Sequence, residues 1–307
     1  MFKHLLIPLD GSRLAEASLP AAISLARSLG SRVTLFHVIE RNAPREVHGE
    51  RHLDNPEEAL DYLRAVASSA FCGLAQVDLH VHDAPESSVS RSIARHAEEF
   101  GSDLIVMCTH GRGGMKAFMS GRIAQQAAAL SSIPVLFVRP DPSGEAPAFQ
   151  CRQMLVPLDG NPAHEQSLAA ASVLAGVYKA EVRLVMVVHN VDTLPAEDAA
   201  AAKMLPIVTV ALLDIAQQDA QAYLQRHVER LREEGLTVTA DVLRGDPVSS
   251  IALAAEMAGA DLVVLGTHAK TGLDAFWSRS ATPHLSRKIQ APILLVPVEE
   301  SETPEQR

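Results

Sequence analysis

The sequence lacks the features that would point to a disulfide or a metal site. Its 307 residues include only three cysteines, Cys72, Cys108 and Cys151, which are far apart and form no Cys-x-x-Cys pair. This pattern fits a reducing compartment and argues against a structural disulfide or a zinc site. The 13 histidines place no His-x3-His pair on one face of a predicted helix, so we expect no built metal site.

Basic residues and long apolar runs are also scarce. The chain has 27 Lys and Arg against 37 Asp and Glu, a net charge of -10. Nucleic acids and anionic membranes select clustered Lys and Arg, so neither is an expected partner. No run of about 18 apolar residues is present, so we expect no membrane span. The first apolar run ends at Asp10 without a cleavage site, and we therefore expect a cytoplasmic protein without a secretory signal.

What the sequence does contain is an internal duplication. Residues 103–115 read Asp-Leu-Ile-Val-Met-Cys-Thr-His-Gly-Arg-Gly-Gly-Met, and residues 261–273 read Asp-Leu-Val-Val-Leu-Gly-Thr-His-Ala-Lys-Thr-Gly-Leu. The copies also begin alike, with Pro-Leu-Asp-Gly at 8–11 and at 157–160. The repeating unit is about half of the chain and is therefore much longer than the repeats of solenoids and propellers. Each copy is expected to be a complete domain with its own core.

The copies differ in length only in their middle parts. Asp10 and Asp159 are 149 residues apart, whereas His110 and His268 are 158 apart, so the second copy carries nine net extra residues. The predicted division of the chain is a first domain at 1–139, a linker at 140–150, a second domain at 151–298 and a disordered tail at 299–307.

Apolar runs rich in Val, Ile and Leu alternate with segments of helical spacing in both copies. The expected strands are 4–9, 33–39, 77–82, 104–109 and 135–138, then 154–158, 182–188, 237–243, 261–267 and 293–298. The expected helices are 14–29, 57–71, 88–100 and 122–131, then 163–178, 214–234, 248–258 and 281–289. Buried strands separated by helices predict right-handed crossovers. Each copy is therefore expected to be an α/β domain with a doubly wound sheet of five parallel strands.

In such sheets small ligands bind beyond the carboxyl ends of the strands. The residues at these ends are Asp10, His37, Val38, Thr109, His110 and Gly111 in the first copy, and Asp159, Met186, Val187, Thr267, His268 and Ala269 in the second. In the first copy a loop with Gly111, Gly113 and Gly121 then leads to a helix. Glycine lets the backbone approach a ligand, and the helix start attracts phosphate. The spacing alone fits a plain strand-to-helix turn equally well.

The combination of Pro-Leu-Asp after the first strand, His-Val after the second and Thr-His-Gly-Arg-x-Gly after the fourth resembles the universal stress protein family over nearly the whole chain. The resemblance implies two tandem domains of the adenine nucleotide alpha hydrolase-like fold. It also implies that the copies pair through their last strands as an intramolecular pseudo-twofold dimer, which is able to dimerise again. In nucleotide-binding members the loop reads Gly-x2-Gly-x9-Gly-Ser/Thr and wraps the ribose and phosphates of ATP.

Carried over residue by residue, the resemblance implies a binding site in each copy for ATP, or for ADP or AMP, which Mg²⁺ can accompany. In the first copy the site residues are Pro8, Leu9, Asp10, Val38, Met107, His110, Gly111, Gly113, Gly121, Arg122 and Ile123. In the second copy they are Leu158, Asp159, Val187, Leu265, Gly266 and Ser280.

Neither loop matches the family pattern fully. The first copy has Cys108 for the first glycine and Arg122 for the hydroxyl residue, whereas the second has Ala269 and Arg279 for the second and third glycines. Arg122 is able to donate a charge-assisted hydrogen bond to phosphate. The Arg279 side chain is expected to fill the phosphate pocket or to prevent the required backbone angle. The first copy is therefore the predicted nucleotide site.

Several site residues have a second interpretation. Asp10 and Asp159 either bind the ribose or base, or form the turn that an Asp-Gly pair makes after a strand. His110 and His268 either take part in the chemistry or only bond neighbouring backbone groups. Neither an acidic metal ligand nor a positioned base accompanies the loop, so we predict no catalytic residue and at most slow ATP hydrolysis.

An apolar stretch, residues 204–215, lies in the region that makes the second copy longer, and it is too short to span a membrane. It either starts a helix that is buried in the sheet or in the other copy, or it forms an apolar surface or cavity for a lipophilic ligand or a partner. We therefore predict a stress-response protein in which nucleotide binding to the first copy biases contacts with an unidentified protein partner. The alternative hypothesis is a non-nucleotide interaction module that works through 204–215.

Overall fold

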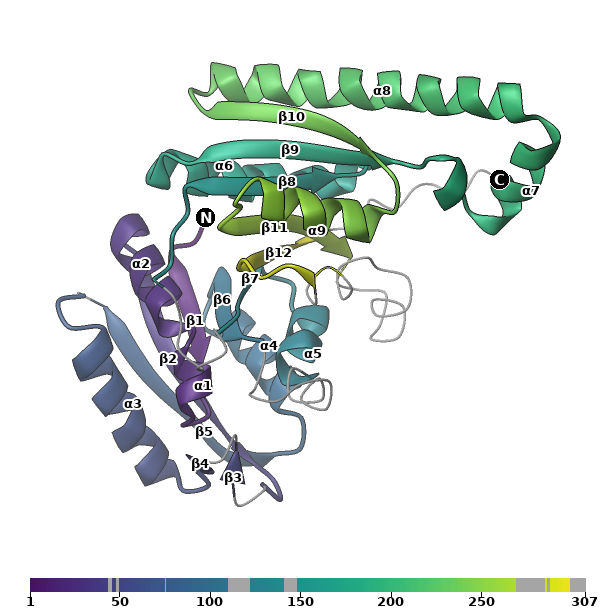
Figure 1. Cartoon of the computed structure of the whole chain (residues 1–307). Helices are drawn as coiled ribbons and strands as arrows, with labels where there is room; N and C mark the ends of the chain where they lie inside the picture. Colours follow the sequence, from purple (N-terminus) through teal and green to yellow (C-terminus); the bar gives the residue numbers. More distant parts are fainter. Residues whose placement is uncertain are drawn as a thin grey trace, which may run out of the picture. The chain divides into compact units, whose positions relative to one another are not determined.

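The computed structural model describes residues 1–43, 46–47, 50–74, 76–109, 122–140, 148–268, 285 and 288–298 (Figure 1). The side chains of Val47, Arg122, Ala196, Glu197 and His268 are not part of that description. The chain separates into two compact units, and each is described by itself. The first contains the first repeat together with residues 292–297, and the second contains residues 151–267.

The first unit is built on five parallel strands in the order β5-β2-β1-β6-β7. These strands are β1 (His4–Pro8), β2 (Arg32–Glu40), β5 (Val77–Glu86), β6 (Leu104–Cys108) and β7 (Val135–Val138). The helices are α1 (Arg13–Glu16), α2 (Leu19–Leu29), α3 (Pro56–Ala70), α4 (Val89–Glu99) and α5 (Arg122–Leu130). A short antiparallel hairpin, β3 (Glu46–Val47) and β4 (Glu50–Arg51), precedes α3. The strand β12 (Ile293–Val298) pairs antiparallel with β7.

The second unit repeats this plan with four parallel strands in the order β10-β9-β8-β11. They are β8 (Gln153–Leu158), β9 (Glu181–Val188), β10 (Thr237–Arg244) and β11 (Leu262–His268). The helices are η2 (Pro162–Glu165), α6 (Gln166–Tyr178), η3 (Val191–Thr193), α7 (Ala196–Met204), α8 (Pro206–Glu233) and α9 (Pro247–Met257). The doubly wound α/β fold expected from the sequence is confirmed, with the same strand order in both copies.

The sheets are covered on both faces, as parallel strands require. Consecutive residues Leu5, Leu6 and Ile7 of β1 are each fully buried, although their side chains point alternately to opposite faces. Residues 104–106 of β6 are buried in the same way. The faces of these two strands are thus closed to a ligand, which leaves their ends.

The expected single helix at 14–29 is wrong, because the chain forms α1 and then restarts as α2. Pro20 lies in the first turn of α2, where its missing N–H is tolerated, whereas inside one continuous helix its ring would clash with the preceding turn. The Ser18 hydroxyl donates to the Ala15 carbonyl at 2.7 Å and helps to close the break.

In the second copy the expected helix at 163–178 likewise begins as the separate 3₁₀ turn η2. The helix expected to start near 214 starts at Pro206, so the extra residues of this copy fall in α7 and in the first turns of α8. The β3-β4 hairpin and the extension of β5 to Glu86 were not expected. Most of the helix expected at 281–289 lies outside the described residues.

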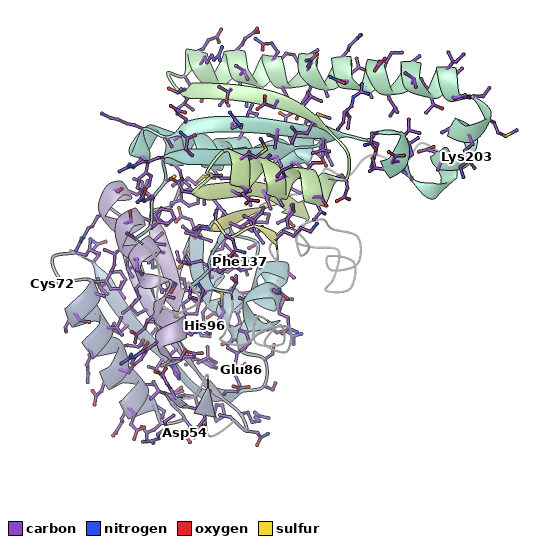
Figure 2. The ribbon with its side chains drawn as sticks, viewed as in Figure 1. Asp54, Cys72, Glu86, His96, Phe137 and Lys203 are labelled. Atoms are coloured by element: carbon purple, nitrogen blue, oxygen red, sulfur yellow. The ribbon has the colours of Figure 1, made fainter. Side chains whose placement is uncertain are left out.

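A layer of histidines lies between the sheet and α4 in the first unit. His96 of α4, labelled in Figure 2, is buried, and its ring centroid is 5.4 Å from that of His80 and 4.8 Å from that of His82, both on β5. Phe36 and Phe100 complete the layer, with ring centroids 4.8 and 5.5 Å from His96. Burial, followed by the positive charges of His96 and His82, lowers the pKa of His80.

This lowered pKa makes the stability of the first unit depend on pH. The unfolded chain binds a proton at His80 near the ordinary pKa of 6.5, before the folded chain does, so the stability is fully present above that pH and falls as the pH decreases below it. The variant His80→Phe keeps a ring in the layer, and we expect it to flatten the plot of unfolding free energy against pH below 6.5. Urea unfolding at a series of pH values measures this, and an unchanged slope would contradict the assignment. Part of the slope should remain, because burial also lowers the pKa of His4 and of His227.

Candidate functional site

In the first unit the carboxyl ends of three adjacent strands bring predicted site residues together. β1 lies between β2 and β6, and the Leu9 N–H donates to the Phe36 carbonyl at 2.8 Å. Leu9, Val38 and Met107 are buried, and Pro8 and Asp10 are half-buried. Val38 lies within β2, which runs to Glu40, and not at its very end. These residues form the apolar and acidic part of the candidate site.

The other predicted residues of the first copy are placed only in part. His110, Gly111, Gly113 and Gly121 lie outside the described residues, as does Ser280 of the second copy. Arg122 is the first residue of α5, and Ile123 follows it with 40% of its surface exposed. The roles of the loop residues therefore stay predictions.

Asp10 forms the turn that leads from β1 into α1. Its Oδ1 atom accepts hydrogen bonds from the Ser12 N–H at 2.9 Å and from the Ser12 hydroxyl at 2.6 Å. The same hydroxyl oxygen accepts from the Ala15 N–H at 3.2 Å and caps α1. The turn interpretation of Asp10 is thus confirmed, whereas binding of a ribose or base stays a prediction.

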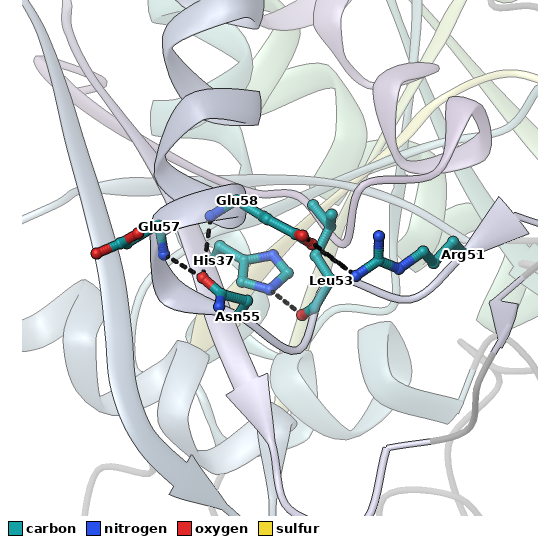
Figure 3. Close-up of polar contacts among 6 residues, drawn as sticks. All are labelled: His37, Arg51, Leu53, Asn55, Glu57 and Glu58. Atoms are coloured by element: carbon teal, nitrogen blue, oxygen red, sulfur yellow. Dashed lines mark hydrogen bonds and ion pairs between the residues drawn. The ribbon is translucent and has the colours of Figure 1, made fainter.

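A segment that the sequence analysis did not single out, residues 50–55, covers this turn. We call it the covering segment. The buried ring of His37 lies within hydrogen-bond distance of two carbonyl oxygens. Its Nδ1 atom is 2.7 Å from Leu9 O, and its Nε2 atom is 3.0 Å from Leu53 O, the contact that Figure 3 shows. Both partners are backbone carbonyl oxygens, which accept hydrogen bonds from an N–H group of the ring. His37 thereby ties the end of β1 to the covering segment.

The covering segment is also held at its two ends. The Glu50 carboxylate accepts from the Arg13 N–H at 2.7 Å. At the other end, Asn55 caps α3, and its Oδ1 atom accepts from the N–H groups of Glu57 and Glu58 at 2.8 and 3.2 Å (Figure 3). The contact between Glu50 and Arg13 connects residues that are distant in sequence, which is why local sequence patterns do not predict it.

The surroundings of Asp10 are acidic. Burial, followed by the carboxylates of Glu16, Asp10 and Glu50, raises the pKa of Tyr62 on α3. The carboxylates that surround this tyrosine attract hydrogen-bond donors and repel anions. This part of the site therefore suits the hydroxyl or amino groups of a ligand better than its phosphates.

In the second unit the corresponding aspartate is already engaged. The Asp159 carboxylate accepts from His164 Nδ1 at 2.8 Å and from the Asn161 N–H at 3.0 Å. Burial alone raises the pKa of Asp159, but the hydrogen bonds from His164 and Asn161 and the charge of His164 together hold this pKa below its usual value. The first copy has Ala15 at the position of His164.

Gly266 packs directly against His164. A Cβ atom at Gly266 would lie 2.9 Å from the carbonyl oxygen of His164 and 3.0 Å from its Cα, too close for any other residue. In the first copy, Ala15 stands at the position of His164 and Cys108 at the position of Gly266. The glycine that resembles a nucleotide-loop residue thus has a packing reason. A side-by-side comparison of the two copies would have revealed this exchange of large and small residues.

A second contact fixes the turn that carries His164. The neighbouring Glu165 accepts from the Tyr223 hydroxyl at 3.0 Å and lies 3.3 Å from Nε2 of His227, both on α8. The contacts of Glu165 with α8 fix the position of η2. The adjacent His164 is thereby kept beside Asp159 and Gly266. Of the other predicted residues of this copy, Leu158 and Leu265 are buried, and Val187 lies within β9 and is half-buried.

Among the described residues, neither the grouping of side chains nor the environment of Cys151 favours metal binding or thiol chemistry. Within the ranges given above, His, Cys, Asp and Glu form no group of three or more that is arranged to hold a metal ion. Burial, followed by the charge of Asp261, raises the pKa of Cys151 to about 12, so this thiol stays protonated. No described helix combines the length and the apolar character that crossing a membrane needs.

The equivalent glycines of the two turns give a matched test of the covering segment. Gly11 has φ +89°, and a Cβ there would lie 2.7 Å from Leu53 Cδ1. Gly160 has φ +82°, and its nearest contact would be an ordinary 3.4 Å to Met186 Cε. We expect Gly160→Ala to cost about 1–2 kcal/mol from the backbone alone, and Gly11→Ala to cost more because Leu53 must also move.

Hydrogen exchange of peptides from each unit measures these local stabilities. Adding Leu53→Ala to both glycine variants should remove the difference between them, since the contact with Leu53 is then absent. Equal losses for Gly11→Ala and Gly160→Ala in the otherwise unchanged chain would show that the covering segment does not press on the turn.

Comparison with known proteins supports the fold and the duplication. The model of the universal stress protein family matches residues 1–139 and again residues 151–297. Over 140 residues, 45% of this chain, the sequence is 32% identical to the universal stress protein Sll1654 of Synechocystis, of which it covers 86%. It is 27% identical over 152 residues to the universal stress protein YxiE of Bacillus subtilis, of which it covers 100%.

Structural similarity extends over both copies. The crystal structure of a universal stress protein from Archaeoglobus fulgidus aligns with 97% of this chain and 97% of its own, with a TM-score of 0.71 and 16% sequence identity. This likeness concerns the fold, and the two family matches concern the sequence. The chain therefore belongs to the universal stress protein family and carries two of its domains in tandem.

Proposed function

We propose that the first domain binds an adenine nucleotide, ATP or its relatives ADP and AMP, at the carboxyl ends of β1, β2 and β6. The observation that carries this proposal is the convergence of buried Leu9, Val38 and Met107 with the half-buried Asp10 at adjacent strand ends. Apolar side chains with one or two polar groups beside them are the usual lining of a small-molecule site.

The charges suggest which way the nucleotide lies. Asp10, Glu16 and Glu50 are close enough to Tyr62 to raise its pKa together, so they would accept hydrogen bonds from ribose hydroxyls and repel phosphates. The phosphates would then extend toward the loop after β6 and the start of α5 at Arg122. A helix N-terminus attracts anions through its free N–H groups and its dipole.

In this proposal the nucleotide acts as a regulatory ligand in the cytoplasm. Its binding at the end of β6 and the start of α5 would change contacts with a protein partner. Mg²⁺ would enter with the phosphates, and hydrolysis would be slow. One family member is solved as a complex with cAMP, but the proposal for this chain rests on its own residues.

We propose that the second domain binds no nucleotide at the equivalent position. Asp159 is engaged by His164 and Asn161, and Gly266 is packed against the His164 backbone. A ligand that used Asp159 would have to replace the hydrogen bonds that its carboxylate already makes with His164 and Asn161. One nucleotide per chain follows.

A second candidate function is an interaction module that works through residues 204–215. The observation that favours it is the exposure of large apolar side chains in this stretch, among them Met204 and Ile207, which are 83% and 85% exposed. The interpretation that this stretch is buried in the sheet is wrong for these side chains. This function is independent of the nucleotide site, and one chain is able to perform both.

Calorimetric titration of the full chain with ATP and Mg²⁺ tests the nucleotide proposal, after a denatured sample has been checked for nucleotide retained through purification. We expect close to one equivalent per chain. Asp10→Asn keeps the acceptor for Ser12 but removes the charge, and it should weaken binding roughly tenfold or more. Asp159→Asn is the matched control and should leave the affinity unchanged. Two equivalents, or equal losses in both variants, would contradict the assignment to the first domain.

A loop variant gives an independent check. Gly121→Val is expected to abolish binding, because a branched side chain would stand where the family pattern requires glycine next to the phosphates. The equivalent test at Gly266 is less clean, since a Cβ there collides with the backbone of His164 and would disturb the fold of the second domain. If Gly121→Val binds ATP as the unchanged chain does, the loop is not the phosphate site.

A further inference from the structure

The first turns of α8 extend beyond the sheet of the second unit. Figure 1 shows α8 running along β10 and continuing past it, with α7 beside its N-terminal end. Lys203, labelled in Figure 2, marks the end of α7. We call residues 204–216 the arm. It lies between β9 and β10, in the part of the second copy that is longer than the corresponding part of the first.

The arm presents apolar side chains to solvent. The exposed fractions are 83% for Met204, 58% for Leu205, 85% for Ile207, 50% for Val208, 50% for Val210, 60% for Leu212 and 52% for Ile215. At about 100° per residue, those on α8 span roughly 200° of its circumference. Leu213, which is 8% exposed, lies on the opposite side of the helix. A surface helix normally shows polar residues outward, so the outward face of the arm has the composition of an interface.

The size of this face matches a stable protein interface. With these exposed fractions, the seven side chains amount to roughly 800 Å² per chain, which is the area that each partner contributes to an interface of standard size. A partner that covers the whole exposed face of the arm would therefore bury enough apolar surface for a specific interface.

The charges indicate what the partner is. No charged residue occurs from 204 to 213, and the first basic residue after Lys203 is Arg226. Asp214, at the end of the uncharged part, is paired with Arg244 at 2.6 Å. Helices that lie on membranes are rich in Lys and Arg on their polar face, so a lipid surface fits poorly, all the more with a net charge of -10. A second copy of the chain meets the arm with an equally uncharged face and without repulsion.

We propose that the arm is a homodimer interface, in which two chains pair through their arms about a twofold axis. Such an interface is self-complementary, because each arm is covered by the same residues that it covers. The proposal makes the second candidate function specific by naming a second copy as the partner, and it rests on that function. It does not depend on nucleotide binding. This contact is separate from the predicted pairing of the two domains within one chain.

Sedimentation velocity of the full chain at micromolar concentration tests the proposal. We expect a dimer for the unchanged chain and a monomer for Ile207→Asp/Leu212→Asp, with a dissociation constant at least about 100-fold higher. Both side chains are exposed in the single chain, so the fold should persist, which circular dichroism and an unchanged ATP titration check. Gln218→Asp adds a charge farther along the same helix and is the control that should stay dimeric.

Cross-linking provides a second measurement that does not weaken the interface. In a Cys72→Ser background, which removes an exposed native thiol, Val210→Cys should link two chains under mild oxidation, whereas Gln218→Cys should not. A monomeric unchanged chain, or a dimer that the double aspartate variant leaves intact, overturns the proposal. Flotation of the unchanged chain, but not of the variant, with phosphatidylglycerol vesicles would assign the arm to a membrane surface and overturn it as well.

Discussion

Burial of both faces of the parallel sheet is the constraint on which the rest of each domain depends. With apolar residues on both sides of β1 and β6, neither face is available to a ligand, and the polar groups gather where the strands end. The turn after the first strand is therefore important for the site, because it positions the aspartate at the strand end and determines where the next helix starts. In both copies a glycine with positive φ, Gly11 or Gly160, makes this turn.

The two copies fill the space beyond this turn differently. In the first, the covering segment reaches over it and Leu53 packs on Gly11, held by His37. In the second, His164 of the turn itself packs against Gly266 and bonds Asp159. Duplicated sequences have thus retained one backbone plan while the side chains at the strand ends have diverged, which is consistent with different roles for the two domains.

The duplication was predictable from the repeated motifs. The α/β class and the succession of strands and helices follow from patterns of apolar residues, because buried strands and helices impose their periodicity on any sequence that forms them. The turn at Asp10 was also predictable from the Asp-Gly pair. The role of His164 was not, since it depends on a contact across the fold with Gly266. The early start of α8 was missed because residues 204–213 are apolar around much of the helix and show no periodicity of 3.6.

The covalent link between the two copies has a consequence for how such a protein changes over time. In an assembly of two identical one-domain chains, a histidine introduced beside the aspartate would alter both halves at once. In this chain one half has His164 at this position and the other has Ala15, so the two halves differ there. Fusion therefore permits asymmetry at a fixed ratio of one to one, so that one half is able to specialise without loss of the other.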